Sequence, residues 1–306
     1  MMATFGLWWF KWNGSNYESR MNGATLQDFK NRGFDYLIAL DGEGNMSNYT
    51  GNGYNDGREL AEFLSDKLSG IQYYAPIPFY QYGAGNKNAR DDPQGSFDNS
   101  YWQKWIDAFL SSSDPNLLGF YWSLESVLQT TTGYGAGKVS VGLIEGLSQY
   151  VRGHGFKLLW IPALGGRTVD YLKKKSSLGD DPSIVQYNIR QYFNYIFCQP
   201  NYYQNSRMTP TNTLYEYNDL KNIVDWIYEG QMYIEMEADK AILGIPEHCR
   251  CGTGGCCKEY ASHYIKAQKD VLGSKFYHRA YYFSTDLRVI DEMEDHCQNN
   301  LGEHYV

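Results

Sequence analysis

Short runs of apolar, aromatic and β-branched residues recur along the chain and alternate with segments in which apolar residues follow helical spacing. Several runs lack polar alternation, which is typical of strands that are buried on both faces of a parallel sheet. They predict eight strands, at residues 5–12, 36–41, 72–80, 118–123, 157–162, 195–200, 232–237 and 277–283.

The intervening segments carry an apolar face at helical spacing and predict helices at residues 56–68, 101–110, 139–151, 220–228, 260–271 and 287–295. Glycine often follows the helical pattern, as at Gly70 and Gly153, which suits a helix C-terminus. Strand and helix alternate without the glycine fingerprint of a dinucleotide-binding sheet. The pattern therefore predicts an α/β fold, a single (β/α)8 barrel that occupies residues 1–306 as one domain.

Composition narrows the class of ligand. The chain has 28 Tyr and 8 Trp, whose flat apolar faces and polar edges suit amphipathic ligands such as sugars, although a compositional bias is an equal explanation. The net charge of −8, with no basic cluster beyond residues 173–175, argues against a nucleic-acid partner. No apolar run approaches the roughly 18 residues of a membrane span, so no membrane partner is expected.

Four of the six cysteines fall within residues 249–257, in the order C-x-C-x4-C-C. A loop stapled by disulfides is the first interpretation. A zinc site completed by His248 or His263 is the second, although this spacing matches no common zinc motif. Free thiols are the third, and the sequence leaves the three open.

The chemistry of such a barrel belongs at the C-terminal ends of its strands. Period-two geometry around the fourth predicted strand divides the residues into two faces, Gly119, Tyr121, Ser123 and Glu125 against Leu118, Phe120, Trp122 and Leu124. The apolar face is expected to pack against helices, so that Glu125 faces the barrel mouth. A capping or ion-paired Glu125 at the junction of strand and loop is the competing interpretation.

The seventh predicted strand carries the acids Glu235, Glu237 and Asp239 on one face. Carboxylates on an inward face are costly unless they are functional or neutralised. A solvated edge strand would explain them otherwise, but a closed barrel has no edge. Glycoside hydrolysis uses two carboxyl groups, one as acid and one as nucleophile or base, and these two strand ends could supply both.

Four segments resemble, in chain order, a barrel family catalogued as a domain of unknown function, number 4855. They read GFYWSLE at 119–125, YVRGHGFKLLWIP at 150–162, QPNYY at 199–203 and EMEAD at 235–239. That family is grouped with the barrel-fold glycoside hydrolases. The resemblance covers the fourth to seventh predicted strands and implies a glycosidase-type barrel, without naming a substrate.

The same segments resemble, more loosely, the large glycosidase clan with its acid/base on the fourth strand and its nucleophile on the seventh. In that clan five residues separate a glycine from the acid/base, as between Gly119 and Glu125. The resemblance implies Glu125 as acid/base and Glu237 as nucleophile, with Glu235 as the alternative. The clan usually places Asn before the acid/base, where this chain has Leu124. Three explanations stay open. Another residue, such as Asn201, binds the sugar 2-hydroxyl; or the sugar has no free 2-hydroxyl; or the mechanism differs from that of the clan.

Further side chains are expected to line the mouth and bind substrate, with a place in the core as the competing interpretation for each aromatic one. Gln199 and Asn201 stand out because amides beside a buried proline need partners. The full set is Trp9, Asp41, Tyr121, Trp160, Gln199, Asn201, Tyr203, Asp239 and Tyr282.

The leading hypothesis is a retaining glycosidase without a cofactor that acts within a polysaccharide, because long loops after the second and third strands suggest an open cleft. A non-catalytic carbohydrate-binding barrel is the first alternative. A metal-assisted barrel enzyme with Glu235, Glu237 and Asp239 as oxygen ligands is the second. A polysaccharide substrate suggests an extracellular or cell-surface location, but the N-terminus lacks the features of a secretory signal, so the compartment stays open.

Overall fold

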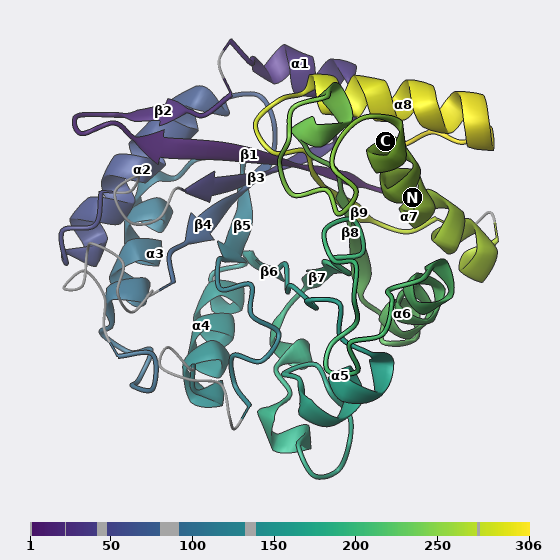
Figure 1. The fold of residues 1–306 in the computed structure, drawn as a ribbon. Helices are drawn as coiled ribbons and strands as arrows, with labels where there is room; N and C mark the ends of the chain where they lie inside the picture. The colour runs from purple at the N-terminus through teal and green to yellow at the C-terminus, as the bar shows by residue number, and fades with distance from the viewer. Residues whose placement is uncertain (1, 22, 42–47, 80–91, 132–138, 274–275) are drawn as a thin grey trace.

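Eight parallel strands close into a barrel in the computed structural model, which describes residues 2–21, 23–41, 48–79, 92–131, 139–273 and 276–306 (Figure 1). Strand β1 pairs with β3 on one side and with β9 on the other, and this second pairing closes the sheet. All eight predicted strands are confirmed. They are β1 (Thr4–Trp12), β3 (Tyr36–Asp41), β4 (Tyr73–Ile77), β5 (Leu117–Trp122), β6 (Lys157–Trp160), β7 (Tyr195–Cys198), β8 (Tyr233–Glu237) and β9 (Arg279–Tyr282).

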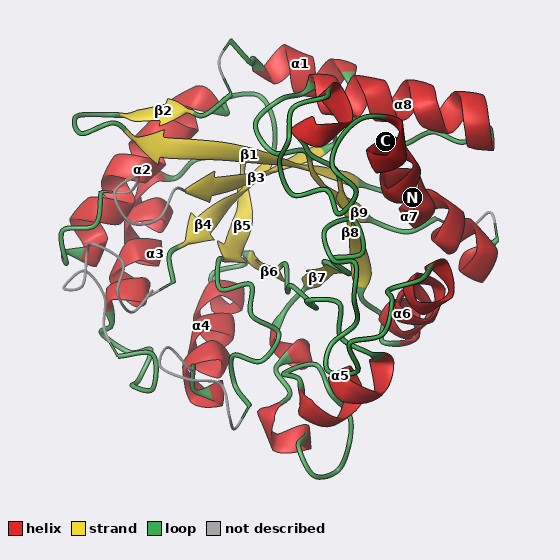
Figure 2. Cartoon of the chain, in the orientation of Figure 1, coloured by secondary structure: helices red, strands yellow, loops and turns green. Residues whose placement is uncertain are grey.

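Helices surround the barrel (Figure 2). The six predicted ones are present as α2 (Gly53–Lys67), α3 (Tyr101–Ser112), α4 (Val141–Gly153), α6 (Tyr217–Glu229), α7 (Gly255–Leu272) and α8 (Arg288–Leu301). The structure adds α1 (Leu26–Asn31), α5 (Val169–Lys175) and the strand β2 (Tyr17–Ser19), which pairs antiparallel with the end of β1. These three elements have three to seven residues each, too few to show a periodic pattern. Within the described residues, no helix has the length and apolar character that a membrane crossing requires.

Alternation along the strands separates two apolar clusters. The barrel interior holds aromatic and aliphatic side chains, among them Phe5, Leu7, Tyr74, Tyr121 and Phe197. A larger cluster lies between the strands and the helices. Which of the two clusters a strand residue joins decides whether its side chain can reach the barrel mouth.

The two-face assignment of β5 needs one correction at its start. Its register with β4 shifts between Tyr73 and Tyr74, and Leu118 packs against the interior cluster rather than toward the helices. The next residue is Gly119, where an added Cβ would lie 1.9 Å from the carbonyl oxygen of Lys157. Only glycine permits this approach of β5 to β6. From Phe120 onward the predicted alternation holds, with Tyr121 inward and Trp122 outward.

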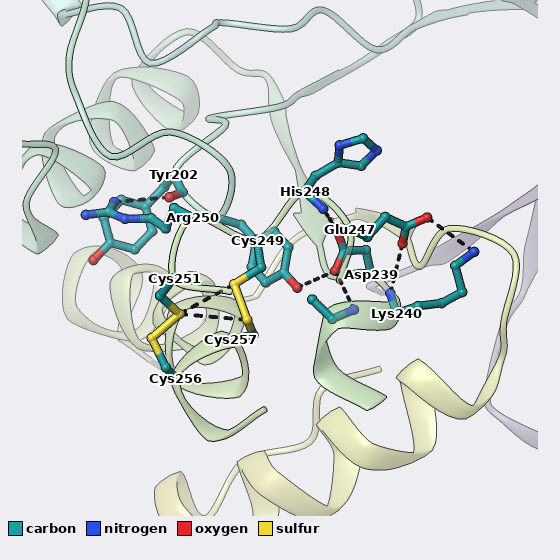
Figure 3. Close-up of a disulfide and its surroundings, with 12 residues drawn as sticks. Tyr202, Asp239, Lys240, Glu247, His248, Cys249, Arg250, Cys251, Cys256 and Cys257 are labelled. Atoms are coloured by element: carbon teal, nitrogen blue, oxygen red, sulfur yellow. Dashed lines mark hydrogen bonds and ion pairs between the residues drawn. A yellow bond between two sulfur atoms is a disulfide. The ribbon is translucent and has the colours of Figure 1, made fainter. Parts of the chain in front are cut away.

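The four clustered cysteines (Figure 3) follow β8 in the chain, and Cys256 and Cys257 lie in the first turn of α7. They form two disulfides, Cys249–Cys257 and Cys251–Cys256. The remaining cysteines, Cys198 and Cys297, are free and buried. The first of the three sequence interpretations, a stapled loop, is therefore the form that this structure shows.

Candidate active site

Glu125 lies just beyond the C-terminal end of β5, where its carbonyl oxygen accepts the N–H of Ala163 at 2.6 Å. The Tyr121 hydroxyl donates to its Oε1 at 3.2 Å, and the Gln199 side chain also hydrogen-bonds to the carboxyl group. The side chain is partly exposed. Desolvation raises the pKa of Glu125, and the two hydrogen bonds oppose this effect. Tyr121 and Gln199 thus orient this carboxyl group.

Glu237 ends β8 on its inward face, opposite Tyr282 of β9. Its Oε1 accepts the Asn201 side-chain amide at 3.1 Å, and its Oε2 accepts the Tyr264 hydroxyl. The carboxyl group is fully buried, and burial raises its pKa to about 8, while the Tyr264 hydrogen bond lowers it and the charge of Glu125 raises it. Two donors therefore hold Glu237 in one orientation.

Glu235 lies two residues earlier on the same face, opposite Ala280 of the barrel interior. It is 2% exposed, and its Oε1 has no hydrogen-bond partner among the described residues. Burial raises the pKa of Glu235 well above its usual range, and the charges of Glu125 and Glu237 add to the effect. Because β8 pairs with both β7 and β9, it is not a solvated edge strand. The barrel thus brings three carboxyl groups within electrostatic reach of one another.

Tyr264 was not among the residues that the sequence singled out. Its position in the apolar pattern of α7 predicts only a core residue, and it is indeed fully buried. Besides donating to Glu237, its hydroxyl oxygen accepts the backbone N–H of Tyr203 at 3.0 Å. This contact joins α7 to the end of β8, and no local sequence signal marks it.

Asp239, which the sequence assigned to substrate binding, is hydrogen-bonded to donors of the protein itself. The residue is buried, and its Oδ1 accepts the Tyr203 hydroxyl at 2.6 Å and the Ala241 N–H at 2.9 Å. Its Oδ2 accepts the backbone N–H of His248 at 2.7 Å (Figure 3). Asp239 caps the short 3-10 helix at Lys240–Leu243, and Tyr203, 1% exposed, supports it. Both residues shape the wall behind Glu237.

Asp41 and Trp160 lie on the outward faces of their strands. Asp41 shares the side of β3 that packs toward the helices and accepts the Tyr49 hydroxyl at 3.1 Å. Trp160 is fully buried, stacks on Phe193 with ring centroids 5.3 Å apart, and donates its indole N–H to the Leu124 carbonyl at 2.7 Å. Neither residue lines the mouth, because period-two alternation directs it away from the interior.

Trp9 and Tyr282 pack against the interior cluster and remain partly exposed, as a mouth position requires. The Arg20 guanidinium lies 5.0 Å from the centre of the Trp9 ring. Burial raises the pKa of Tyr282, and the charges of Glu247, Asp239 and Glu235 raise it further. Tyr282 therefore belongs to the neighbourhood of the β8 acids. Parts of the predicted long loops, residues 42–47 and 86–91, lie outside the described residues, as do residues 80–85 before the second of them.

Within the described residues, Glu235, Glu237 and Asp239 do not form a group of ligand atoms close enough together to hold an ion. Both oxygens of Asp239 are occupied by protein donors, and both oxygens of Glu237 accept hydrogen bonds. Among the described residues, the group of side chains spaced to hold an ion is Cys249, Cys251 and Cys257, outside the barrel mouth.

The class that this fold defines is the (β/α)8 barrel, with glycoside hydrolases among its structural neighbours. A family GH1 β-glucosidase from the fungus Humicola insolens, in complex with glucose, matches with a TM-score of 0.50 and 10% identity, over 85% of this chain and 77% of the enzyme. A malate synthase from Haloferax volcanii matches with a TM-score of 0.46 and 9% identity, over 97% of this chain and 69% of the synthase. At such identity the likeness shows the fold alone.

The chain belongs to the same family as the uncharacterized protein MJ0957 of Methanocaldococcus jannaschii. The two are 32% identical over 341 aligned positions, which cover 95% of this chain and 91% of the relative. No protein-family model matches the sequence, so membership of the family numbered 4855 is not confirmed.

Proposed function

We propose that this protein is a retaining glycoside hydrolase that cleaves a polysaccharide internally, with Glu125 as acid/base and Glu237 as nucleophile. The observation that carries the proposal is the pairing of a partly exposed Glu125 with a buried Glu237 held by two hydrogen-bond donors. The charge of Glu125 contributes to the raised pKa of Glu237, so the two carboxyl groups interact electrostatically.

The proton is best placed on Glu125 once sugar is bound. Glu237 is already buried, so a ligand changes its solvation little, whereas a sugar over Glu125 removes the remaining water from that carboxyl group. Glu125 then protonates the glycosidic oxygen as the bond to the anomeric carbon breaks, and Glu237 forms an ester bond to that carbon. Water, deprotonated by Glu125, hydrolyses the ester and restores both groups.

Glu237 is preferred to Glu235 because of its donors. The Asn201 amide and the Tyr264 hydroxyl stabilise a negative charge on Glu237, whereas Oε1 of Glu235 has no donor within the described residues. Glu235 is expected to remain protonated and neutral. The backbone N–H of Gly165 fixes Oδ1 of Asn201 at 2.6 Å, so the second amide hydrogen of Asn201 could bind a sugar hydroxyl, which Leu124 cannot do.

The test compares wild type with Glu125→Gln and Glu237→Gln on a panel of polysaccharides. The matched control is Glu62→Gln, which changes an exposed carboxyl group on helix α2. Oligosaccharide release should fall roughly 10²–10⁴-fold in the two site variants and stay unchanged in the control. A fluorinated sugar that traps the ester should label Glu237 and not Glu235. Tight glycan binding without release by wild type would instead identify a binding barrel, the first alternative.

A further inference from the structure

The cysteine cluster, separate from the three carboxyl groups, brings four sulfur atoms together in the segment that leads into α7 (Figure 3). Besides the two disulfides, the Sγ of Cys251 lies 3.6 Å from that of Cys249 and 3.7 Å from that of Cys257. Cys249 and Cys257 are buried. Each disulfide thus contacts the other, and the sulfur atoms of Cys249, Cys251 and Cys257 lie within 4.8 Å of one another.

Those contacts match the dimensions of a thiolate metal site. Zinc binds sulfur at about 2.3 Å with tetrahedral geometry, so neighbouring sulfurs in a four-thiolate site lie about 3.8 Å apart. The two contacts of the Cys251 sulfur are already close to that length. Cys256, which is bonded to Cys251, would supply the fourth thiolate once that disulfide is reduced. Soft thiolate ligands select ions of the zinc class over magnesium or calcium.

Two features next to the cysteines in sequence bear on the charge of such a site, a cation and a helix N-terminus. Four thiolates around one divalent cation carry a net charge of −2. Arg250 lies between two of the cysteines in sequence, and its guanidinium donates to the carbonyl oxygens of Tyr202 and Tyr215, at 3.2 and 2.9 Å, with no acidic partner among the described residues. Cys256 and Cys257 occupy the first turn of α7, an 18-residue helix whose N-terminal end stabilises thiolates.

We propose that Cys249, Cys251, Cys256 and Cys257 form a binding site for one divalent ion of the zinc class, and that the two disulfides are its oxidised, metal-free form. Reduction of each disulfide takes two electrons and two protons from a dithiol, which becomes a disulfide. Binding then exchanges the four thiol protons for one metal ion. The site also reaches the barrel wall, because Arg250 donates its backbone N–H to the Tyr203 carbonyl at 2.9 Å.

The test uses the full chain, reduced with a dithiol under anaerobic conditions, incubated with zinc and freed of excess metal. We expect about one zinc per chain by mass spectrometry of the metal, and at least a tenfold lower content in Cys251→Ser and in Cys256→Ser. Cys297→Ser is the matched control, since this buried cysteine lies on α8 outside the cluster, and it should keep its zinc. Cobalt in place of zinc should give the intense visible absorption of a tetrahedral thiolate site.

Circular dichroism and glycan turnover are measured on the same samples, so that loss of fold or of activity is seen separately from loss of metal. A folded, reduced protein that binds no zinc would overturn the proposal. So would zinc content that is unchanged in both cluster variants, or a count of only two reactive thiols in the unfolded chain after dithiol treatment. None of these outcomes depends on whether the barrel hydrolyses glycosides.

Discussion

The buried Glu235 makes a quantitative prediction about stability. The pKa of Glu235 is raised in the folded chain above the ordinary value of 4.5. At any pH between 4.5 and the folded pKa, Glu235 therefore releases a proton when the chain unfolds. Release of a proton on unfolding makes unfolding easier as pH rises, by about 1.4 kcal/mol per pH unit for each such group. The destabilisation begins near pH 4.5 and grows until the folded pKa is reached.

Glu235→Gln replaces the neutral acid with a neutral amide of the same shape and removes this proton. At each pH between the ordinary value and the folded pKa of Glu235, the free energy of unfolding of wild type should therefore fall more steeply than that of the variant, by up to about 1.4 kcal/mol per pH unit. Urea unfolding at several pH values, followed by circular dichroism with the disulfides intact, measures both slopes. Glu62→Gln controls for exposed carboxyl groups. Parallel slopes for wild type and Glu235→Gln would show that Glu235 is ionised in the folded chain.

Two further substitutions probe the site and the barrel. Above pH 8, where Glu237 is ionised, Tyr264→Phe removes the hydroxyl that donates to this carboxylate and should cost about 2–3 kcal/mol in urea unfolding, against about 1 kcal/mol for Tyr281→Phe, which loses a neutral bond of 2.9 Å. Equal losses would contradict the charge-assisted bond. Gly119→Ala places a Cβ against a backbone carbonyl and should cost about 3 kcal/mol or lower soluble yield, whereas Gly153→Ala at the open end of α4 should stabilise slightly. A tolerated Gly119→Ala would refute the close approach of β5 to β6.

Periodicity alone predicted every barrel strand, because each is a short apolar run and burial on both faces tolerates little polarity. The same rule places Glu235 and Glu237 on the inward face of β8. The same period-two rule places Asp41 and Trp160 on the outward faces of their strands. They were assigned to the barrel mouth because of their residue types, and not because of their positions along the strands. The bulge that moves Leu118 inward depends on pairing between two strands and has no signal within one.

Tertiary contacts decided the rest of the site. The contact between Tyr264 and Glu237 joins a helix to a strand, and the capping role of Asp239 depends on the fold of the nine residues that follow it. In the sequence, Asp239 only continues the period-two pattern of Glu235 and Glu237, so nothing marks it as a capping residue. A polar residue at a strand end can bind substrate or can hydrogen-bond to the backbone. Only the positions of its hydrogen-bond donors in the folded structure distinguish these two roles.

Closure of the sheet joins the two ends of the chain, because Thr4–Gly6 pair with Arg279–Tyr281. A nascent chain grows by about 5–20 residues per second, so β1 waits on the order of 15–60 seconds for its last partner. During that interval one edge of β1 stays open, joined by an edge of β8 once that strand has been made, and interior aromatic side chains such as Phe5 are accessible to other chains. The final strand thus sets the moment at which the newly made protein ceases to need protection from aggregation.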